Sequence, residues 1–160
     1  MSRTLIINNV PFQIPDAGDE PGWGDETSDW MEAVTEVLTD LVGPADILET
    51  SFTVANNQVT LADVTGLVFD GGTVRSAVVE YSVYRISDTN PSGFAESGTM
   101  RLTYDNNAVV PWTMSQGDVN GNAETYFDIT TLGQIQYKTN DIGSLNYIGT
   151  MRFTAKAQLQ

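Results

Sequence analysis

The sequence predicts a mainly β protein: an antiparallel β-sandwich or jelly-roll-like domain, preceded by an extended N-terminal arm and one α-helix. Three observations carry this prediction. From residue 47 onward, short runs of alternating apolar and polar residues recur every 8 to 14 residues, as in half-buried strands. Glycine, asparagine and proline turns separate these runs. Convincing helical periodicity is confined to residues 25–42.

The first part of the chain is predicted to be the arm. Between residues 14 and 30 it carries six carboxylates and several glycines, with no lysine or arginine. Pro11, Pro15 and Pro21 are expected to block regular strand pairing, although an edge strand is permitted. A segment of this composition cannot bury itself, so we expect another chain to hold it.

The helix is expected to start near Asp25 or Thr27, which are good N-cap residues, and to end before Gly43-Pro44. Its apolar residues allow two interpretations. One is a broad stripe for docking on a sheet, formed by Trp30, Val34, Val37, Leu38 and Leu41. The other is a heptad-like seam for self-association, formed by Met31, Val34, Leu38 and Leu41. We therefore divide the chain into residues 1–46, the attachment arm and helix, and residues 47–160, the β-sandwich.

The first strands of the sandwich are predicted around an Asn56-Asn57 turn, with apolar residues alternating on both sides of it. The longest strand is expected at 74–86, with Ala77, Val79, Tyr81 and Val83 on one face. Residues 88–95 read as a loop.

The remaining strands follow the same reasoning. A hairpin is expected over residues 96–115, with its tip at Asp105-Asn106-Asn107 and Met100, Leu102 and Tyr104 on one face. Three more strands are predicted at Thr125–Thr130, Gln134–Lys138 and Tyr147–Leu159.

Composition excludes several classes of function. The net charge is −14, from 21 acidic and 7 basic residues, so we expect no nucleic acid partner and no membrane partner. The sequence contains no histidine and no cysteine. The usual neutral-pH general base, the catalytic triad and thiolate chemistry are therefore absent. We expect no enzymatic activity and no catalytic residues.

The best metal candidate is the stretch "DVNGNAE", in which Asp118, Asn120, Asn122 and Glu124 place oxygen ligands at alternate positions. Gly121 is in the wrong place for an EF-hand loop. The stretch also reads as a type I′ hairpin turn at Asn120-Gly121. We expect no bound metal and no cofactor.

Four aromatic residues could form a stacking surface for a sugar: Tyr81, Tyr84, Trp112 and Tyr147. Burial of these side chains would favour a structural role instead, and core packing is the expected role of Trp112. A small glycosidase with two facing carboxylates is a further alternative.

Two pieces of the sequence resemble tailed-bacteriophage virion proteins. The opening "INNVPFQIPDAGDEPGWGDETSDWMEAVTEVL" is similar to the start of many such proteins, where an "I-N-G-x-x-Y/F-x-x-P" piece precedes "P-G-D-x-x-W-G" and a helix. This chain departs from that pattern at Asn9 and Ala17. The segment from Ala55 to Tyr104, with "GQIQYKTND" and "GTMRFTAKAQL", is similar to a small β-sandwich of phage fibre, tail and capsid-associated proteins.

The resemblance implies a non-enzymatic virion structural protein: a capsid decoration or head fibre, or a short tail-fibre-like component. It would be made in the host cytoplasm, attached through its arm to other capsid or tail proteins, and would expose the β-sandwich. The alternative is a carbohydrate- or receptor-binding module for a host surface glycan. A homo-oligomer is expected, with a trimer favoured. The expected partner-binding residues are Leu5, Ile7, Phe12, Ile14, Trp23, Trp30, Met31, Val34, Leu38 and Leu41.

Overall fold

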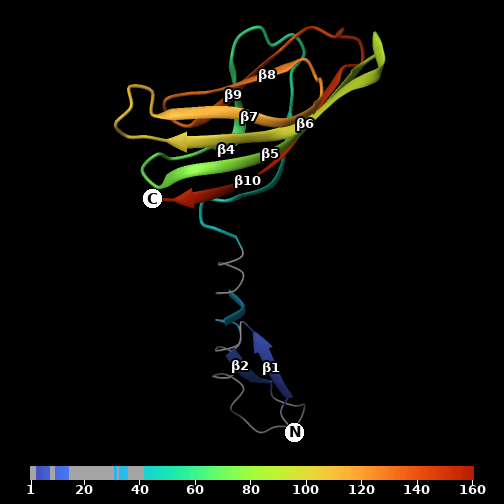
Figure 1. Cartoon of the computed structure of the whole chain (residues 1–160). Coiled ribbons are helices and arrows are strands. Elements are labelled where there is room, and N and C mark those ends of the chain that lie inside the picture. The colour runs from blue at the N-terminus through green and yellow to red at the C-terminus, as the bar shows by residue number, and fades with distance from the viewer. Residues whose placement is uncertain (1–2, 8–9, 15–30, 32, 36–41) are drawn as a thin grey trace. The chain divides into compact units, whose positions relative to one another are not determined.

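The computed structural model describes residues 3–7, 10–14, 31, 33–35 and 42–160 (Figure 1). The chain divides into two units, Met1–Pro44 and Ala45–Gln160. The second unit contains eight of the ten strands found among the described residues, and it is described throughout its length.

The described part of the first unit contains a β-hairpin. Strand β1 (Arg3–Ile7) pairs antiparallel with β2 (Val10–Ile14), and Pro11 lies opposite Ile6. The expectation that prolines block pairing throughout this segment is therefore wrong at Pro11. Each strand of a two-stranded ribbon has one edge without a partner strand, and a proline whose missing N–H faces that edge removes no ladder hydrogen bond.

Helical residues are described at Met31 and at 33–35, where the Thr35 hydroxyl donates to the carbonyl of Met31 (2.7 Å). The rest of the predicted helix, including its start, lies outside the described residues. Gly43 and Pro44 are not helical, in agreement with the predicted end. Within the described residues, no helix is both long and apolar enough to cross a lipid bilayer.

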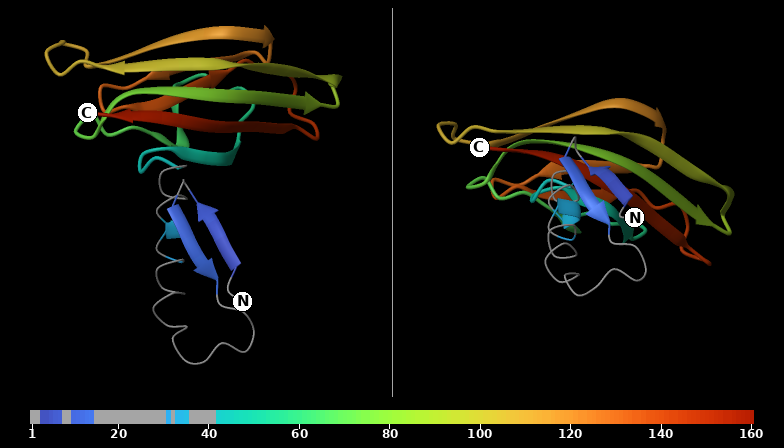
Figure 2. Two further views of the ribbon diagram at one scale, coloured as in Figure 1. Left: turned by 60° about the horizontal axis from the view of Figure 1, so that its bottom comes forward. Right: turned by 90° about the horizontal axis from the view of Figure 1, so that it is seen from below.

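The second unit is a sandwich of two antiparallel sheets, which confirms the predicted fold class (Figures 1 and 2). One sheet has five strands in the order β3-β10-β5-β6-β7, and the other has three in the order β4-β9-β8. The strands are β3 (Ile47–Thr53), β4 (Ala62–Val68), β5 (Val74–Ser87), β6 (Asn90–Tyr104), β7 (Trp112–Gly121), β8 (Thr125–Ile129), β9 (Gln134–Thr139) and β10 (Ile148–Leu159).

Side chains from both sheets form a single core. Along β5 burial alternates as predicted, with Ala77, Val79, Tyr81 and Val83 inside. Full burial of a side chain such as Val79 or Val83 stabilises the fold by about 1.5–3 kcal/mol. Facing residues complete the core: Val64, Leu67, Phe69, Met100, Leu102, Trp112, Ile135, Tyr137, Met151 and Phe153.

The turn predicted at Asn56-Asn57 is present, but the strands before and after it do not pair with each other, because β3 joins β10 and β4 joins β9 in the other sheet. Two local predictions are wrong. The predicted loop at 88–95 is mostly strand, since β6 begins at Asn90. Asn120-Gly121 is not a hairpin turn, because both residues end β7 and pair with β6. Turn-forming residues such as asparagine and glycine indicate where the chain changes direction, but they do not determine which sheet the next strand joins.

Candidate functional site

The outer face of the five-stranded sheet carries side chains from β3, β10, β5, β6 and β7. Alternation places polar, mostly small side chains on it. Cross-strand rows follow from the register: Thr150, Tyr84 and Ala95 form one, and Arg152, Ser82 and Ser97 the next. Successive rows are two residues apart, so these side chains share one face.

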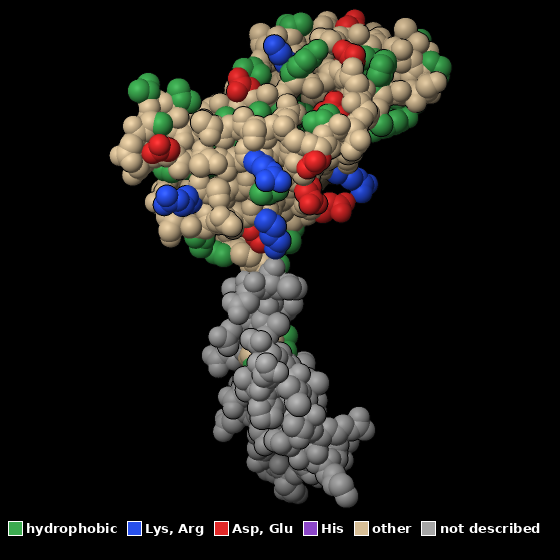
Figure 3. Space-filling view, in the orientation of Figure 1, with side chains coloured by type: hydrophobic (Ala, Val, Ile, Leu, Met, Phe, Trp, Pro, Cys, Tyr) green, Lys and Arg blue, Asp and Glu red, His purple; other side chains and the backbone are tan. Residues whose placement is uncertain are grey.

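Basic side chains concentrate on this face. Lys156 and Arg101 lie opposite Val78 from its two neighbouring strands, Arg152 is on β10, and Arg75 is exposed at the start of β5. Arg75, Arg101, Arg152 and Lys156 are called the basic strip below. Figure 3 shows Lys and Arg side chains over β5 and β10 in this view.

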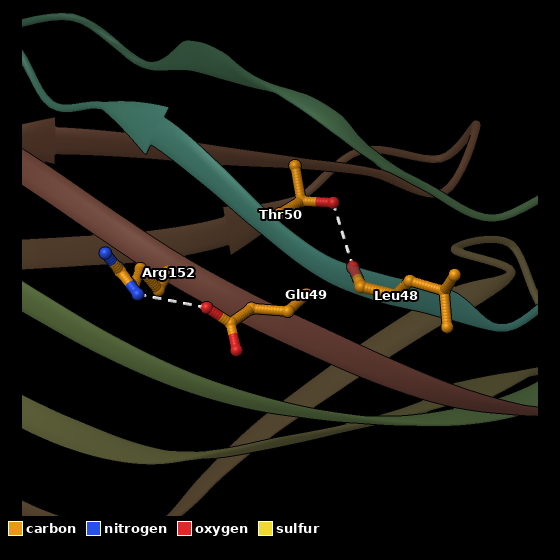
Figure 4. Close-up of polar contacts among 4 residues, drawn as sticks. All are labelled: Leu48, Glu49, Thr50 and Arg152. Carbon is orange, nitrogen blue, oxygen red and sulfur yellow. Dashed lines mark hydrogen bonds and ion pairs between the residues drawn. The ribbon is translucent and has the colours of Figure 1, made fainter.

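The ion pairs of the basic strip are unevenly distributed. Arg152 Nη1 lies 3.0 Å from Glu49 Oε1, which joins β10 to the edge strand β3 (Figure 4). Both side chains are about two-thirds exposed, so this pair contributes at most about 1 kcal/mol. Lys156 Nζ lies 2.6 Å from Asp46 Oδ2, whose side chain is nearly buried. Arg75 and Arg101 form no ion pair with any carboxylate in the described part of the chain.

The same face has a shallow depression of about 670 Å³. Its lining includes small residues (Ser82, Ala95, Ser97 and Gly121) together with Tyr84, Asn120 and Arg152. Tyr84 is 44% exposed and packs against Gly93, where a Cβ atom would lie 2.8 Å from the phenol oxygen. The depression is wide and open, which suits an extended partner better than a small molecule.

A second, polar pocket of about 400 Å³ lies beside the three-stranded sheet. Tyr126 is 51% exposed there, and Lys138 Nζ lies 5.6 Å from the centre of its ring, within cation–π range. Asn57 and Asp141 also line this pocket. Hydrogen bonds from the Gly143 N–H and the Asn56 side chain lower the pKa of Asp141, so this carboxyl is anionic at neutral pH.

The buried Arg85 guanidinium is structural rather than part of a site. It is fully buried, and its five hydrogen bonds of 2.7–3.0 Å all go to uncharged acceptors. Its ring neighbour is Tyr147, whose hydroxyl in turn donates to the carbonyl of Val54 (2.9 Å). No buried side-chain polar atom of the described residues lacks a partner.

Glu96 and Tyr81 form a second buried polar cluster. The Tyr81 hydroxyl donates to Glu96 Oε1 (2.9 Å), and Glu96 Oε2 accepts from the Ala123 N–H (3.0 Å). Gln116 Nε2 donates to the Tyr81 oxygen (3.1 Å). Burial raises the pKa of Tyr81 well above its usual value, and the hydrogen bond and negative charge of Glu96 raise it further.

Tyr81→Phe tests this cluster. We expect a loss of about 1–2 kcal/mol in unfolding free energy at neutral pH, because buried Glu96 loses a hydrogen bond. The folded-state pKa of Tyr81 lies above the unfolded value of about 10. Its contribution to stability is therefore complete below pH ~10 and decreases as the pH rises toward the folded-state pKa. Urea unfolding at neutral and alkaline pH gives the free energy of unfolding of both proteins. Between these two pH values it should fall less in Tyr81→Phe than in the wild type. Tyr84→Phe, at an exposed ring, should unfold like the wild type, and an unchanged alkaline decrease in Tyr81→Phe would contradict the assignment.

In the metal candidate "DVNGNAE", the Glu124 carboxylate accepts hydrogen bonds from two side-chain amides. Glu124 Oε1 accepts from Asn122 Nδ2 (3.0 Å), and Glu124 Oε2 accepts from Asn140 Nδ2 (2.7 Å). Asp118 has a positive φ of 51° and lies where the β6–β7 register shifts, a β-bulge. Among the described residues, no three acidic side chains come close enough together to hold a metal ion.

The aromatic platform that the glycan-binding alternative requires does not form. Trp112 and Tyr81 are in the core, and Trp112 packs against Phe69 and Tyr104, which confirms its core role. Tyr147 is half-buried and bonded to Arg85. Tyr84 alone of the four is exposed, so the alternative of a glycan-binding module loses the surface on which it was predicted.

The predicted partner-binding residues lie in the first unit. Leu5 on β1 lies opposite Phe12 on β2, and Ile7 and Ile14 belong to the same hairpin. Met31 is 58% exposed, and Val34 is half-buried. Four lie outside the described residues: Trp23, Trp30, Leu38 and Leu41.

Sequence reasoning missed the basic strip. The strand periodicity places Arg101 and Lys156 on outward positions, and this signal was available in the sequence. The sequence did not show that Arg101 and Lys156 lie close together. Their proximity depends on the pairing of β10 with β5, which lies more than 60 residues earlier. The register brings together cations that the sequence scatters over 82 residues, from Arg75 to Lys156.

Comparison with known proteins gives one distant likeness. No family model matches the sequence, and no curated protein matches it. Among solved structures, the chain is similar to the crystal structure of the Acinetobacter phage vB_ApiP_P1 tailspike protein, with a TM-score of 0.40 and 11% sequence identity. The match covers 71% of this chain and 20% of that one. The matched part of this chain spans about a fifth of the length of that protein.

Proposed function

We propose that this chain is a non-enzymatic structural component of a tailed-phage virion, attached through residues 1–46 and exposing the β-sandwich of residues 47–160. One observation carries the proposal: the chain divides into an N-terminal unit and a sandwich that closes its own core. The core side chains of the described residues all belong to the second unit, and this proposal assigns attachment to the N-terminal unit. The opening sequence motif supports the same assignment.

The absence of histidine and cysteine from the sequence supports a role without catalysis. The exposed Met31 side chain is in keeping with a seam between copies. A trimer built on Met31, Val34, Leu38 and Leu41 is the oligomer that we propose. Closed symmetry allows one such patch to serve every copy.

The proposal is tested by locating the chain. Antibodies raised against the β-sandwich should label particles purified from a phage-producing lysate of the host that carries this gene. Light scattering of the purified protein should give the mass of a closed oligomer. Recovery of the protein only in the soluble fraction, with unlabelled particles, would overturn the virion assignment.

Deletion of residues 1–24 tests the attachment device. We expect a soluble chain with an intact sandwich, because the described core residues all lie in the second unit, and we expect it to be absent from particles. Circular dichroism checks folding, and mass spectrometry of particles measures incorporation. Normal incorporation would show that another surface attaches the protein, and failure to fold would show that the segment belongs to the core.

A further inference from the structure

We infer that the basic strip binds the acidic segment 16–29 of a second copy of this chain, so that copies associate head to tail. This deepens the proposed function by naming the partner of the arm, and it rests on that proposal only in treating the arm as an attachment device. Charge complementarity within one sequence points to this pairing. The association can be tested with purified protein in solution, without phage particles. The head-to-tail association and the virion role can therefore each fail independently.

The acceptor surface differs from the rest of the sandwich in charge. The unit Ala45–Gln160 carries twelve carboxylates and six cations. Four of the cations form the basic strip, and the carboxylates on that face are Asp46, Glu49 and Glu80. Outside that face, Lys138 is the one exposed cation of the unit. Eight carboxylates lie in loops, on the three-stranded sheet or at the bulge of β7: Asp63, Asp70, Asp88, Asp105, Asp118, Glu124, Asp128 and Asp141.

The donor segment is the most acidic part of the chain. Residues 1–44 contain nine carboxylates and a single cation, Arg3. Six of those carboxylates fall within 14 residues: Asp16, Asp19, Glu20, Asp25, Glu26 and Asp29. A segment with this charge and without internal cations gains most by pairing with a basic surface.

The geometry of the strip fits an extended acidic peptide. Arg101 and Lys156 flank the exposed Val78, and Arg152 lies two rows further along the sheet, beside the shallow depression. The small residues in the lining of this depression allow a backbone to approach closely. Arg75 and Arg101 have guanidinium groups that no described carboxylate holds, and a guanidinium binds a carboxylate in a two-point geometry.

The charges indicate that the partner of the basic strip is a second copy of this chain. Each copy offers one acidic segment and one basic strip, so the numbers of donors and acceptors always match. The two patches differ, so the contact is heterologous and gives a ring or a chain of copies. The net charge of −14 makes whole molecules repel, but this repulsion is screened beyond about 8 Å at physiological salt, whereas direct contacts persist.

Charge reversal tests the pairing in the full-length protein. Arg75→Glu with Arg101→Glu reverses the strip, and Asp16→Lys with Asp19→Lys and Glu20→Lys reverses the segment. The control leaves Arg152 unchanged, because Arg152 belongs to the basic strip. Lys138→Glu alone is the matched control, since it makes the same type of change on the three-stranded sheet. Sedimentation equilibrium measures association of each protein and of a mixture of the two reversed proteins.

The expected result is that wild type and Lys138→Glu associate alike, while each reversed protein alone associates about ten- to a hundredfold more weakly. The mixture should recover association, since each reversed patch then meets an oppositely charged one. Raising salt from about 0.1 M to about 1 M, which shortens the screening length from ~10 to ~3 Å, should weaken the wild-type complex.

Several outcomes would overturn the inference. These are a monomeric wild type at millimolar concentration, unchanged association of either reversed protein, or a mixture that does not recover. If the wild-type protein becomes more compact at low salt while its molecular mass stays that of a monomer, the acidic segment binds the basic strip of its own chain. If association is unaffected by every charge change while the protein still labels particles, the proposed function survives and this inference fails.

Discussion

Replacing Arg85 with methionine is expected to lower the free energy of unfolding by about 4 kcal/mol or more, a large loss for a single substitution. Methionine keeps the length of the side chain and removes its donors. The five acceptors that lose their hydrogen bonds are the Tyr147 hydroxyl, Asn56 Oδ1 and the carbonyls of Ala123, Glu124 and Asn140. The bond to the Ala123 carbonyl is buried and the other four are partly buried. A buried acceptor left without a partner costs about 1–3 kcal/mol, and a partly exposed one costs less.

The position of Arg85 in the fold enlarges this effect. It projects from β5 at one end of the sandwich and reaches three segments that connect the two sheets. Asn56 follows β3, Ala123 precedes β8, and Asn140 follows β9. Buried ion pairs can often be replaced by apolar residues at little cost, but here most acceptors are backbone groups that no accompanying substitution can remove. The side chain therefore holds the inter-sheet connections together.

Arg101→Met is the matched control, because it makes the same substitution at an exposed position of the neighbouring strand. We expect it to change stability by no more than about 0.5 kcal/mol. Urea unfolding of both variants, followed by circular dichroism, measures the difference. An Arg85→Met protein as stable as Arg101→Met would show that water or rearranged side chains satisfy the five acceptors.

Strand positions could be predicted from the sequence because they depend on local alternation. Val79, Tyr81 and Val83 occupy every second residue of β5 and are all buried, and the strands after residue 124 were placed within about two residues at their ends. The same phase, continued along β5, puts Arg85 and Ser87 inside. An inward arginine was therefore visible in the pattern, although its acceptors were not, since they come from loops distant in sequence.

Strand partners could not be predicted, because pairing between distant strands is decided by the whole core. The two runs around Asn56-Asn57 have hairpin-like patterning, yet they enter different sheets. Asn120-Gly121 has the composition of a tight turn and is nevertheless held in the ladder with β6. The basic strip has the same origin: outward positions follow from periodicity, whereas the neighbours of Arg101 follow from register.

The second large effect is expected for Gly133→Ala, which should lower the free energy of unfolding by about 3 kcal/mol. Gly133 lies between β8 and β9 with a φ of +81°, which L side chains rarely adopt. An added Cβ would overlap the carbonyl oxygen of Phe69 and lie 2.9 Å from Trp112 Nε1. Relief would require moving the hydrogen bond from the Phe69 N–H to the Gly133 carbonyl (3.0 Å), which ties this turn to the chain after β4.

Gly117→Ala supplies the comparison for that prediction. Gly117 lies on β7 without a positive φ, and the nearest atom to its added Cβ would be Thr99 Oγ1 at an ordinary 3.5 Å. We expect Gly117→Ala to stay within about 1 kcal/mol of the wild type, because it adds a methyl group without a clash. Urea unfolding gives both free energies, and near-ultraviolet circular dichroism reports the environment of Trp112. Equal stabilities for the two variants, with an unchanged aromatic signal in Gly133→Ala, would show that the turn can shift away from Phe69 at little cost.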